Sequence, residues 1–78
     1  MSASLNRQLC DNLIHNLITL RRQYGLTKKG MARLLGISLY SLNTLEAGRI
    51  PAQLGIEMLF RAQARFDISL RDLFGQRL

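Results

Sequence analysis

A chain of 78 residues is long enough for one domain with a modest core, so we expect a single domain over residues 1–78. Apolar residues make up 47% of it, which excludes a disordered protein, and no apolar run approaches the roughly 20 residues of a membrane-spanning helix. Cys10 is the single cysteine, which excludes an internal disulfide and a cysteine-based zinc site. Because no secretory leader pattern is present either, we expect a cytoplasmic protein.

The composition favours an all-α fold, because β-branched residues are sparse and there is one proline. The first helix is predicted over residues 4–24, and Gly25 ends it. Apolar residues at spacings of three and four form its core stripe: Leu9, Leu13, Leu17, Leu20 and Tyr24. A second apolar flank consists of Leu5, Cys10, Ile14 and Ile18. With this flank the helix has more apolar surface than a small monomer needs to bury, which indicates a dimer.

The stretch 26–51, LTKKGMARLLGISLYSLNTLEAGRIP, predicts two short helices joined by a tight turn. Thr27 and Ser38 are the expected caps, because their hydroxyls accept hydrogen bonds from otherwise unpaired backbone N–H groups. Gly36 suits the left-handed conformation of the turn, and Gly48 ends the second helix. The residues expected inward are Met31, Ala32, Leu35, Leu42 and Leu45. Such a pair is a helix-turn-helix, whose second helix can enter the major groove of DNA.

Two further helices complete the predicted five. The fourth covers residues 54–66, with these side chains inward: Leu54, Met58, Leu59, Ala62 and Phe66. Ser69 caps a last helix over residues 70–74, in which Leu70, Leu73 and Phe74 are expected to be buried, and residues 76–78 are expected to fray. The candidate dimer surfaces are Leu5, Leu9 and Ile14 in the first helix and Leu73, Phe74 and Leu78 at the C-terminal end.

The net charge of +6 is concentrated in the helix-turn-helix. Residues 21–49 contain six cations, and Glu46 is their single acid. The rest of the chain has five cations and four acids, so it is almost neutral. A basic cluster that coincides with a helix-turn-helix is typical of contact with phosphates.

The helix-turn-helix resembles that of the phage-repressor and Cro-like group, also called the XRE family. The matching residues are Thr27, Met31, Ala32, Leu35, Gly36, Ile37, Ser38, Leu42, Leu45, Glu46 and Gly48. The resemblance extends upstream through 20–21 and 25–26, and downstream through the segment 67–74, DISLRDLF. It implies a compact five-helix, lambda-repressor-like domain of bacterial or phage origin, which binds double-stranded DNA as a homodimer.

The resemblance also implies roles for single residues. Thr27 and Lys28 correspond to positions that touch phosphates, and Arg49 to one that meets the DNA backbone. Lys29 and Arg33 are expected to add phosphate contacts because of their charge. The positions that correspond to base readers are Ser38, Leu39, Tyr40, Asn43 and Thr44. Arg21 and Glu46 correspond to a structural salt bridge between the first and third helices.

The chain departs from the family pattern at several positions. Lys28 stands where Gln is common. Gly30 lies inside the second helix, at a cost of about 1 kcal/mol relative to Ala, and Phe66-Asp67 lacks the usual Gly. Leu39 and Tyr40 replace bidentate polar side chains: Leu39 can only pack or contact a thymine methyl, and Tyr40 can donate one hydrogen bond or stack. Asn43 is therefore the best candidate to read a base, because its amide can pair with adenine.

Two functions remain open. The first is a sequence-specific DNA-binding regulator, a repressor that occupies an operator. The second is a protein-interaction module of the same fold, similar to an anti-repressor or antitoxin, in which Leu39 and Tyr40 form a docking patch. An enzyme is not expected, because His15 is the only histidine and no phosphate-binding loop or cysteine pair is present. We likewise expect no metal, cofactor or small-molecule ligand.

Overall fold

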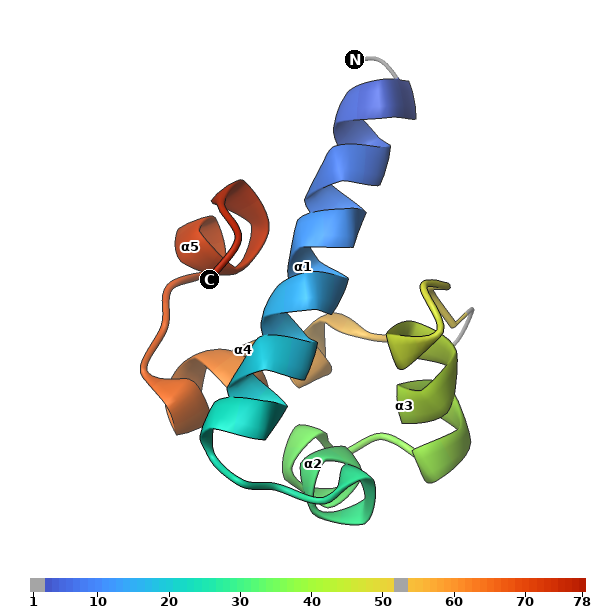
Figure 1. Cartoon of the computed structure of the whole chain (residues 1–78), viewed down its shortest axis with the longest axis vertical. Coiled ribbons are helices and arrows are strands. Elements are labelled where there is room, and N and C mark those ends of the chain that lie inside the picture. The colour runs from blue at the N-terminus through green and yellow to red at the C-terminus, as the bar shows by residue number, and fades with distance from the viewer. Residues whose placement is uncertain (1–2, 52–53) are drawn as a thin grey trace.

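The computed structural model describes residues 3–51 and 54–78, and the side chains from residue 7 onward within these ranges. Over this part of the chain it consists of helices joined by short loops, without a β-strand (Figure 1). The helices are α1 (Ala3–Gln23), α2 (Lys28–Leu35), α3 (Leu39–Glu46), α4 (Ile56–Phe66) and α5 (Leu70–Gly75). The predicted all-α fold with five helices is confirmed.

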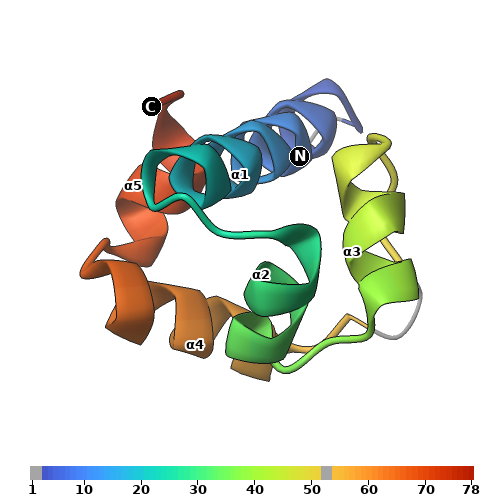
Figure 2. The ribbon, with the colours of Figure 1, turned by 60° about the horizontal axis from the view of Figure 1, so that its bottom comes forward.

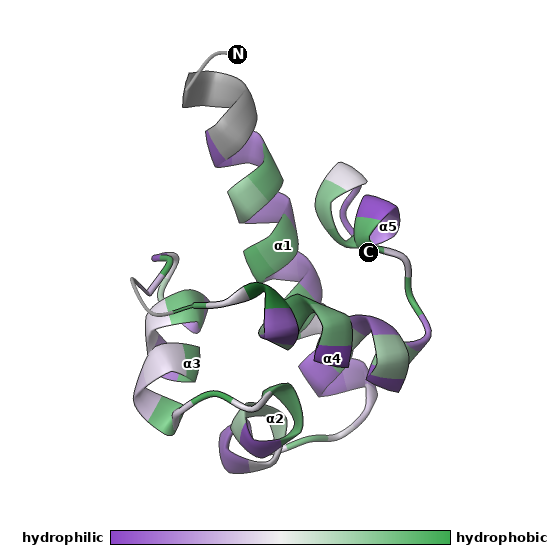
Figure 3. Ribbon diagram, turned by 180° about the vertical axis from the view of Figure 1, so that it is seen from behind, coloured by the Kyte–Doolittle hydropathy of each residue, from purple (hydrophilic) through white to green (hydrophobic). Residues whose placement is uncertain are grey.

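The long helix α1 is the central support of the fold. Helices α3 and α5 lie on opposite sides of it, and α2 packs against α3 and α4 (Figures 1 and 2). The hydropathy colouring shows apolar positions of α4 and of the C-terminal half of α1 among the polar ones, as amphipathic helices around a shared core require (Figure 3). The helix-turn-helix of α2 and α3 therefore lies away from α5, with α3 packed against α1 and α2 packed against α4.

One hydrophobic core joins all five helices. All five inward positions predicted for the helix-turn-helix are buried in it, and Met31 is completely enclosed. Burial of a Leu or Met side chain contributes roughly 1.5–3 kcal/mol, so this core is the main source of stability. Its members are Leu13, Ile14, Leu17, Leu20, Met31, Ala32, Leu35, Leu42, Leu45, Met58, Ala62, Phe66 and Leu73.

A left-handed residue lies within two residues of the end of each of the first four helices, and the sequence predicted three of these four, Gly25, Gly36 and Gly48. At the end of α2, Gly36 has φ +72°, and the N–H of Ile37 donates to the carbonyl of Ala32 at 3.0 Å. This is the Schellman arrangement, which satisfies carbonyls at the helix terminus. Asp67 takes the same role after α4 with φ +51°, although an L side chain is strained there and Asp is among the few residues that tolerate it. Thus the chain makes a left-handed turn at this position without a glycine.

The predicted start of α4 and the predicted burial of Tyr24 are wrong, and Leu70 and Phe74 are half-buried against the core instead of fully buried. Helix α4 begins at Ile56 and not at residue 54, because Gly55 is its extended N-cap. Leu54 belongs to a preceding turn, in which its N–H donates to the carbonyl of Pro51 at 3.2 Å. Tyr24 lies beyond the last residue of α1 and is exposed, so it is not part of the core stripe. Its ring instead contacts the edge of Phe66, with 4.9 Å between the ring centroids.

The candidate dimer surfaces also need correction. Ile14 and Leu73 belong to the core and are buried where α5 packs against α1, so neither is available to a second copy. Leu9 and Phe74 are half-buried, and the side chain of Leu5 lies outside the described residues. Of the six candidates, Leu78 is the one whose side chain is described as exposed.

The C-terminal residues 76–78 are held by α1 instead of fraying. Asn16 of α1 is fully buried, and its amide nitrogen donates to the carbonyls of Leu73 and Gln76 at 2.7 Å each. Its amide oxygen accepts from the N–H of Leu78 at 2.8 Å. One turn earlier, Asn12 donates to the carbonyl of Phe74 at 2.9 Å. The prediction of fraying was wrong because these two asparagines satisfy the carbonyls that α5 leaves unpaired at its end.

Replacement of Asn16 tests this attachment. Asn16→Ala leaves buried carbonyls without a donor, and we expect the free energy of unfolding to fall by about 2–4 kcal/mol. Chemical denaturation measures the change. Gln8→Ala, an exposed substitution on the same helix, is the control and should remain within about 0.5 kcal/mol of wild type. Equal stability of the two variants would contradict a structural role for Asn16.

Candidate nucleic-acid interface

The N-terminus of α2 exposes two lysines and free backbone donors. Thr27 caps the helix, since its hydroxyl oxygen accepts from the N–H of Gly30 at 3.0 Å. The N–H groups of Lys28 and Lys29 belong to the first turn of the helix, which has no intrahelical acceptors. Both lysine side chains are exposed. Ammonium groups, free N–H groups and the positive end of the helix dipole all favour an anion here.

The turn between α2 and α3 is short and anchored in the core. Ile37 is half-buried against the core cluster. Ser38 then caps α3, with its hydroxyl oxygen accepting from the N–H of Ser41 at 3.0 Å. Because the turn is fixed at both helix ends, α3 has a defined direction relative to α2.

Helix α3 has a buried face and an exposed face. Leu42 and Leu45 each expose 1% of their surface and attach the helix to the core. On the opposite side, Tyr40 is 79% exposed and Leu39 37% exposed. Asn43 is exposed as well, one turn after Leu39. The structure therefore brings these three predicted base readers to one surface.

The remaining two predicted base readers have hydroxyls that are engaged within the helix. Thr44 is half-buried, and its hydroxyl donates to the backbone carbonyl of Tyr40 at 2.9 Å. The Ser38 hydroxyl donates to the hydroxyl of Ser41 at 3.0 Å while it caps the helix. Ser38 and Thr44 thus keep acceptor lone pairs for a ligand but have no hydroxyl hydrogen left to donate.

The predicted phosphate contacts flank this exposed face. Arg33 is exposed on α2, and Arg49 is exposed just after α3. The backbone of Arg49 is fixed, since its N–H donates to the carbonyl of Thr44 at 3.0 Å. Sequence reasoning missed Arg61 of α4, whose guanidinium lies over the turn: a Cβ built on Gly36 would be 3.0 Å from its Nε. Because the two residues are far apart in the chain, no local sequence signal could have placed Arg61 there.

The ion pair expected between Arg21 and Glu46 is present. Nε of Arg21 lies 2.7 Å from Oε2 of Glu46, and a second guanidinium nitrogen donates to Oε1 at 3.1 Å. The two side chains are only 16% and 12% exposed. Arg21 also donates to the carbonyl of Leu26 at 3.2 Å. The pair therefore belongs to the frame that holds α3 against α1 and does not face outward as a ligand-binding group.

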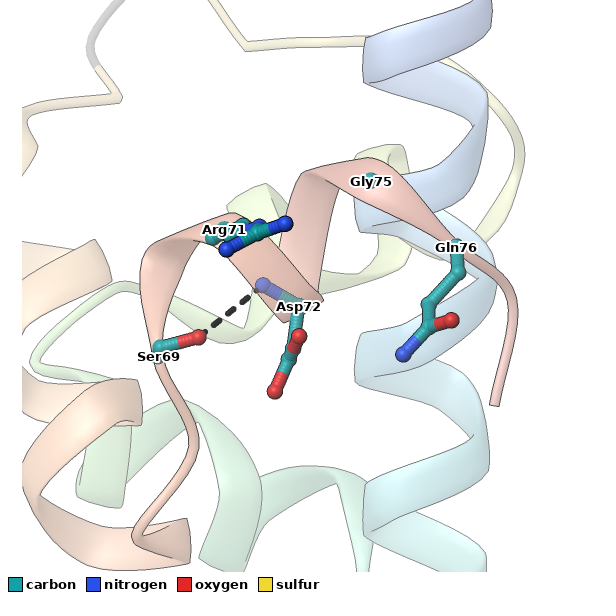
Figure 4. Close-up of a pocket in the computed structure, with 5 residues that line it drawn as sticks. All are labelled: Ser69, Arg71, Asp72, Gly75 and Gln76. Atoms are coloured by element: carbon teal, nitrogen blue, oxygen red, sulfur yellow. Dashed lines mark hydrogen bonds between the residues drawn. The ribbon is translucent and has the colours of Figure 1, made fainter.

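A hollow lies beside α5, and the groups that line it do not converge on a ligand. It is lined by polar residues and Gly75 (Figure 4). Ser69 is engaged as the helix cap, since its hydroxyl accepts from the N–H of Asp72 at 3.1 Å. Within residues 3–51 and 54–78, no three His, Cys, Asp or Glu side chains gather to hold a metal ion.

No known protein family, curated protein or solved structure matches this chain in the comparisons made. In the described ranges, every helix is too short or too polar to cross a lipid bilayer. The site must therefore be interpreted from its own geometry and charge.

The ion pair can be tested by a double-mutant cycle. Arg21→Met or Glu46→Leu alone leaves a largely buried charge unpaired. Each should lower the free energy of unfolding by about 2–3 kcal/mol, a value between those of exposed and fully buried ion pairs. The double variant should cost less than the sum, because both charges are removed together. Urea unfolding of the four proteins gives the coupling energy.

The pair between Arg61 and Glu57 is the matched control. It joins the same two residue types at 3.3 Å on α4, but its side chains are 48% and 80% exposed. Its coupling energy should be no more than about 0.5 kcal/mol. Similar coupling in both cycles would show that the Arg21–Glu46 pair does not fix α3.

Proposed function

We propose that this protein is a sequence-specific DNA-binding regulator, a repressor that places α3 in the major groove of an operator. The observation that carries the proposal is the unopposed positive charge around the helix-turn-helix. Glu46 is the single acid of residues 21–49, and it is paired with Arg21. The remaining cations of this stretch are exposed: Arg22, Lys28, Lys29, Arg33 and Arg49.

Such a surface suits a polyanion with regularly spaced phosphates. Each Lys or Arg that neutralises a phosphate releases a condensed counterion, which makes binding favourable at low salt. The N-terminus of α2, with Lys28 and its free N–H groups, is the natural first phosphate contact. Binding there would bring the exposed face of the neighbouring α3 toward the base edges, which is the docking geometry of helix-turn-helix proteins.

A protein-interaction module is the second candidate, and the exposure of Tyr40 and Leu39 favours it. Apolar side chains that project from a helix are common anchors in protein interfaces. The exposed cations weigh against this candidate, because docking on an apolar patch gives no reason for so many lysines and arginines beside it. The two functions differ in their response to salt and to DNA.

A salt titration tests the proposed function. Binding to a random-sequence duplex should weaken steeply as salt rises, with a linear relation between log K and log salt concentration. Lys28→Ala and Arg33→Ala should each weaken binding to all sequences alike and lower the magnitude of the slope by about 1. Fluorescence anisotropy with a labelled duplex measures both quantities.

Arg71→Ala is the matched control for these two variants. Arg71 is an exposed cation on α5, which lies on the other side of α1 from α3 (Figures 1 and 2). Its loss removes the same charge but no proposed contact, so the slope should stay as in wild type. No binding to duplex at low salt would exclude the DNA-binding function and favour the protein-interaction module.

We also propose that the protein is of bacterial or phage origin and acts as a homodimer in the bacterial cytoplasm. A two-fold axis would place two copies of α3 about 34 Å apart, one turn of the DNA helix. Light scattering at micromolar concentration should then give twice the mass of 8.9 kDa for one chain. Leu78→Asp tests the remaining exposed candidate, and Phe60→Asp tests the exposed apolar residue of α4. A monomer mass for the wild-type protein would refute the dimer.

A further inference from the structure

Resting on the proposed function, we infer that α3 reads the methyl groups of thymine, so that the protein selects A·T base pairs over G·C base pairs in the major groove. The base edges differ in chemistry: guanine presents two acceptors, adenine a donor and an acceptor, and thymine an acceptor and the C5 methyl. The groups that α3 exposes can be compared with each of these edges.

Guanine presents two acceptors side by side, and the donors that α3 exposes are the single hydroxyl of Tyr40 and the amide of Asn43. Arg and Lys, which make the commonest contact with guanine, are absent from Leu39–Glu46. The hydroxyl hydrogens of Ser38 and Thr44 are already donated to Ser41 and to the carbonyl of Tyr40. Their remaining lone pairs can accept from adenine or cytosine but not from guanine.

Thymine requires an apolar surface, and the first turn of α3 provides one. Leu39 and Tyr40 are adjacent and project at the N-terminal end, where recognition helices contact base edges. Thr44 follows Tyr40 by one turn. Because its hydroxyl hydrogen is donated to the carbonyl of Tyr40, Thr44 can offer its methyl group and the acceptor lone pairs of its oxygen. The C5 methyl of thymine is the one apolar group that an unmodified base pair presents in the major groove, so it is the partner for this surface.

Asn43 adds the matching polar contact. It is exposed one turn after Leu39, and no hydrogen bond within the described residues engages its amide. A free amide can pair with N6 and N7 of adenine in a bidentate manner. A methyl contact and an amide contact one turn apart thus select thymine and adenine in neighbouring base pairs.

Replacement of thymine by uracil isolates the methyl contact. The duplex is obtained by selection from a random pool with this protein, and each thymine is then changed to deoxyuridine in turn. This change removes the methyl but keeps every hydrogen-bonding group and every phosphate. We expect one or more positions at which affinity falls about fourfold, the factor for burial of one methylene-sized group. In Leu39→Ala, the penalty at such a position should fall toward onefold.

Ile56→Ala is the control, because Ile56 is an exposed aliphatic side chain on α4 with no assigned contact to DNA or to a second copy, at 64% exposure against 37% for Leu39. It should retain the full uracil penalty. A selected site rich in G·C pairs, no sequence preference, or equal affinity for thymine and uracil at every position would overturn the inference while leaving salt-dependent DNA binding intact. No binding to any duplex at low salt would overturn the proposed function as well.

Discussion

The position of α3 depends on the buried ion pair between Arg21 and Glu46. Helix α3 has only eight residues and two fully buried leucines, which is a small contact area for a helix that must present its outer face in one orientation. The bidentate pair joins its last residue to α1, and the same guanidinium holds the carbonyl of Leu26 in the loop before α2. One side chain thus connects α1, the entry to the helix-turn-helix and the end of α3.

Two polar residues of α1, which we call its anchors, fix the helices that lie on either side of it. Arg21 near its C-terminal end fixes α3, and Asn16, more than one turn earlier, fixes α5 and the residues after it. Each anchor makes at least three hydrogen bonds to specific partners. A largely buried polar group of this kind penalises any other arrangement. Non-directional leucine packing alone would tolerate small rotations of the helices, so the anchors supply orientation while the core supplies stability.

The local parts of this fold could be predicted, and the long-range parts could not. Caps such as Thr27 and Ser38 act within three residues, so the sequence pattern alone predicts them. Asn16 resembles any polar residue of an amphipathic helix, because its partners lie more than fifty residues away. Long-range partners are equally invisible for Leu73. Its apolar side chain predicts a buried contact, but the sequence does not show that α1 of the same chain makes this contact, so a dimer surface is an equally valid prediction. For the candidate site, sequence predicted which residues of α3 face outward, whereas the engaged hydroxyl of Thr44 required the structure.

In the proposed DNA complex, charged residues would contact phosphates and α3 would contact bases, and this separation favours a dimer. Phosphate contacts give affinity without sequence information, so discrimination must come from α3. One amide-adenine pair contributes about 1–3 kcal/mol, and each buried methyl about 0.8 kcal/mol. One copy of α3 therefore supplies roughly 2–5 kcal/mol, at the lower end of the 4–10 kcal/mol that separates specific from non-specific binding. Two copies on adjacent half-sites would double this difference, so the proposed recognition helix, with so few donors, would require a dimer more strictly than one that carries arginine.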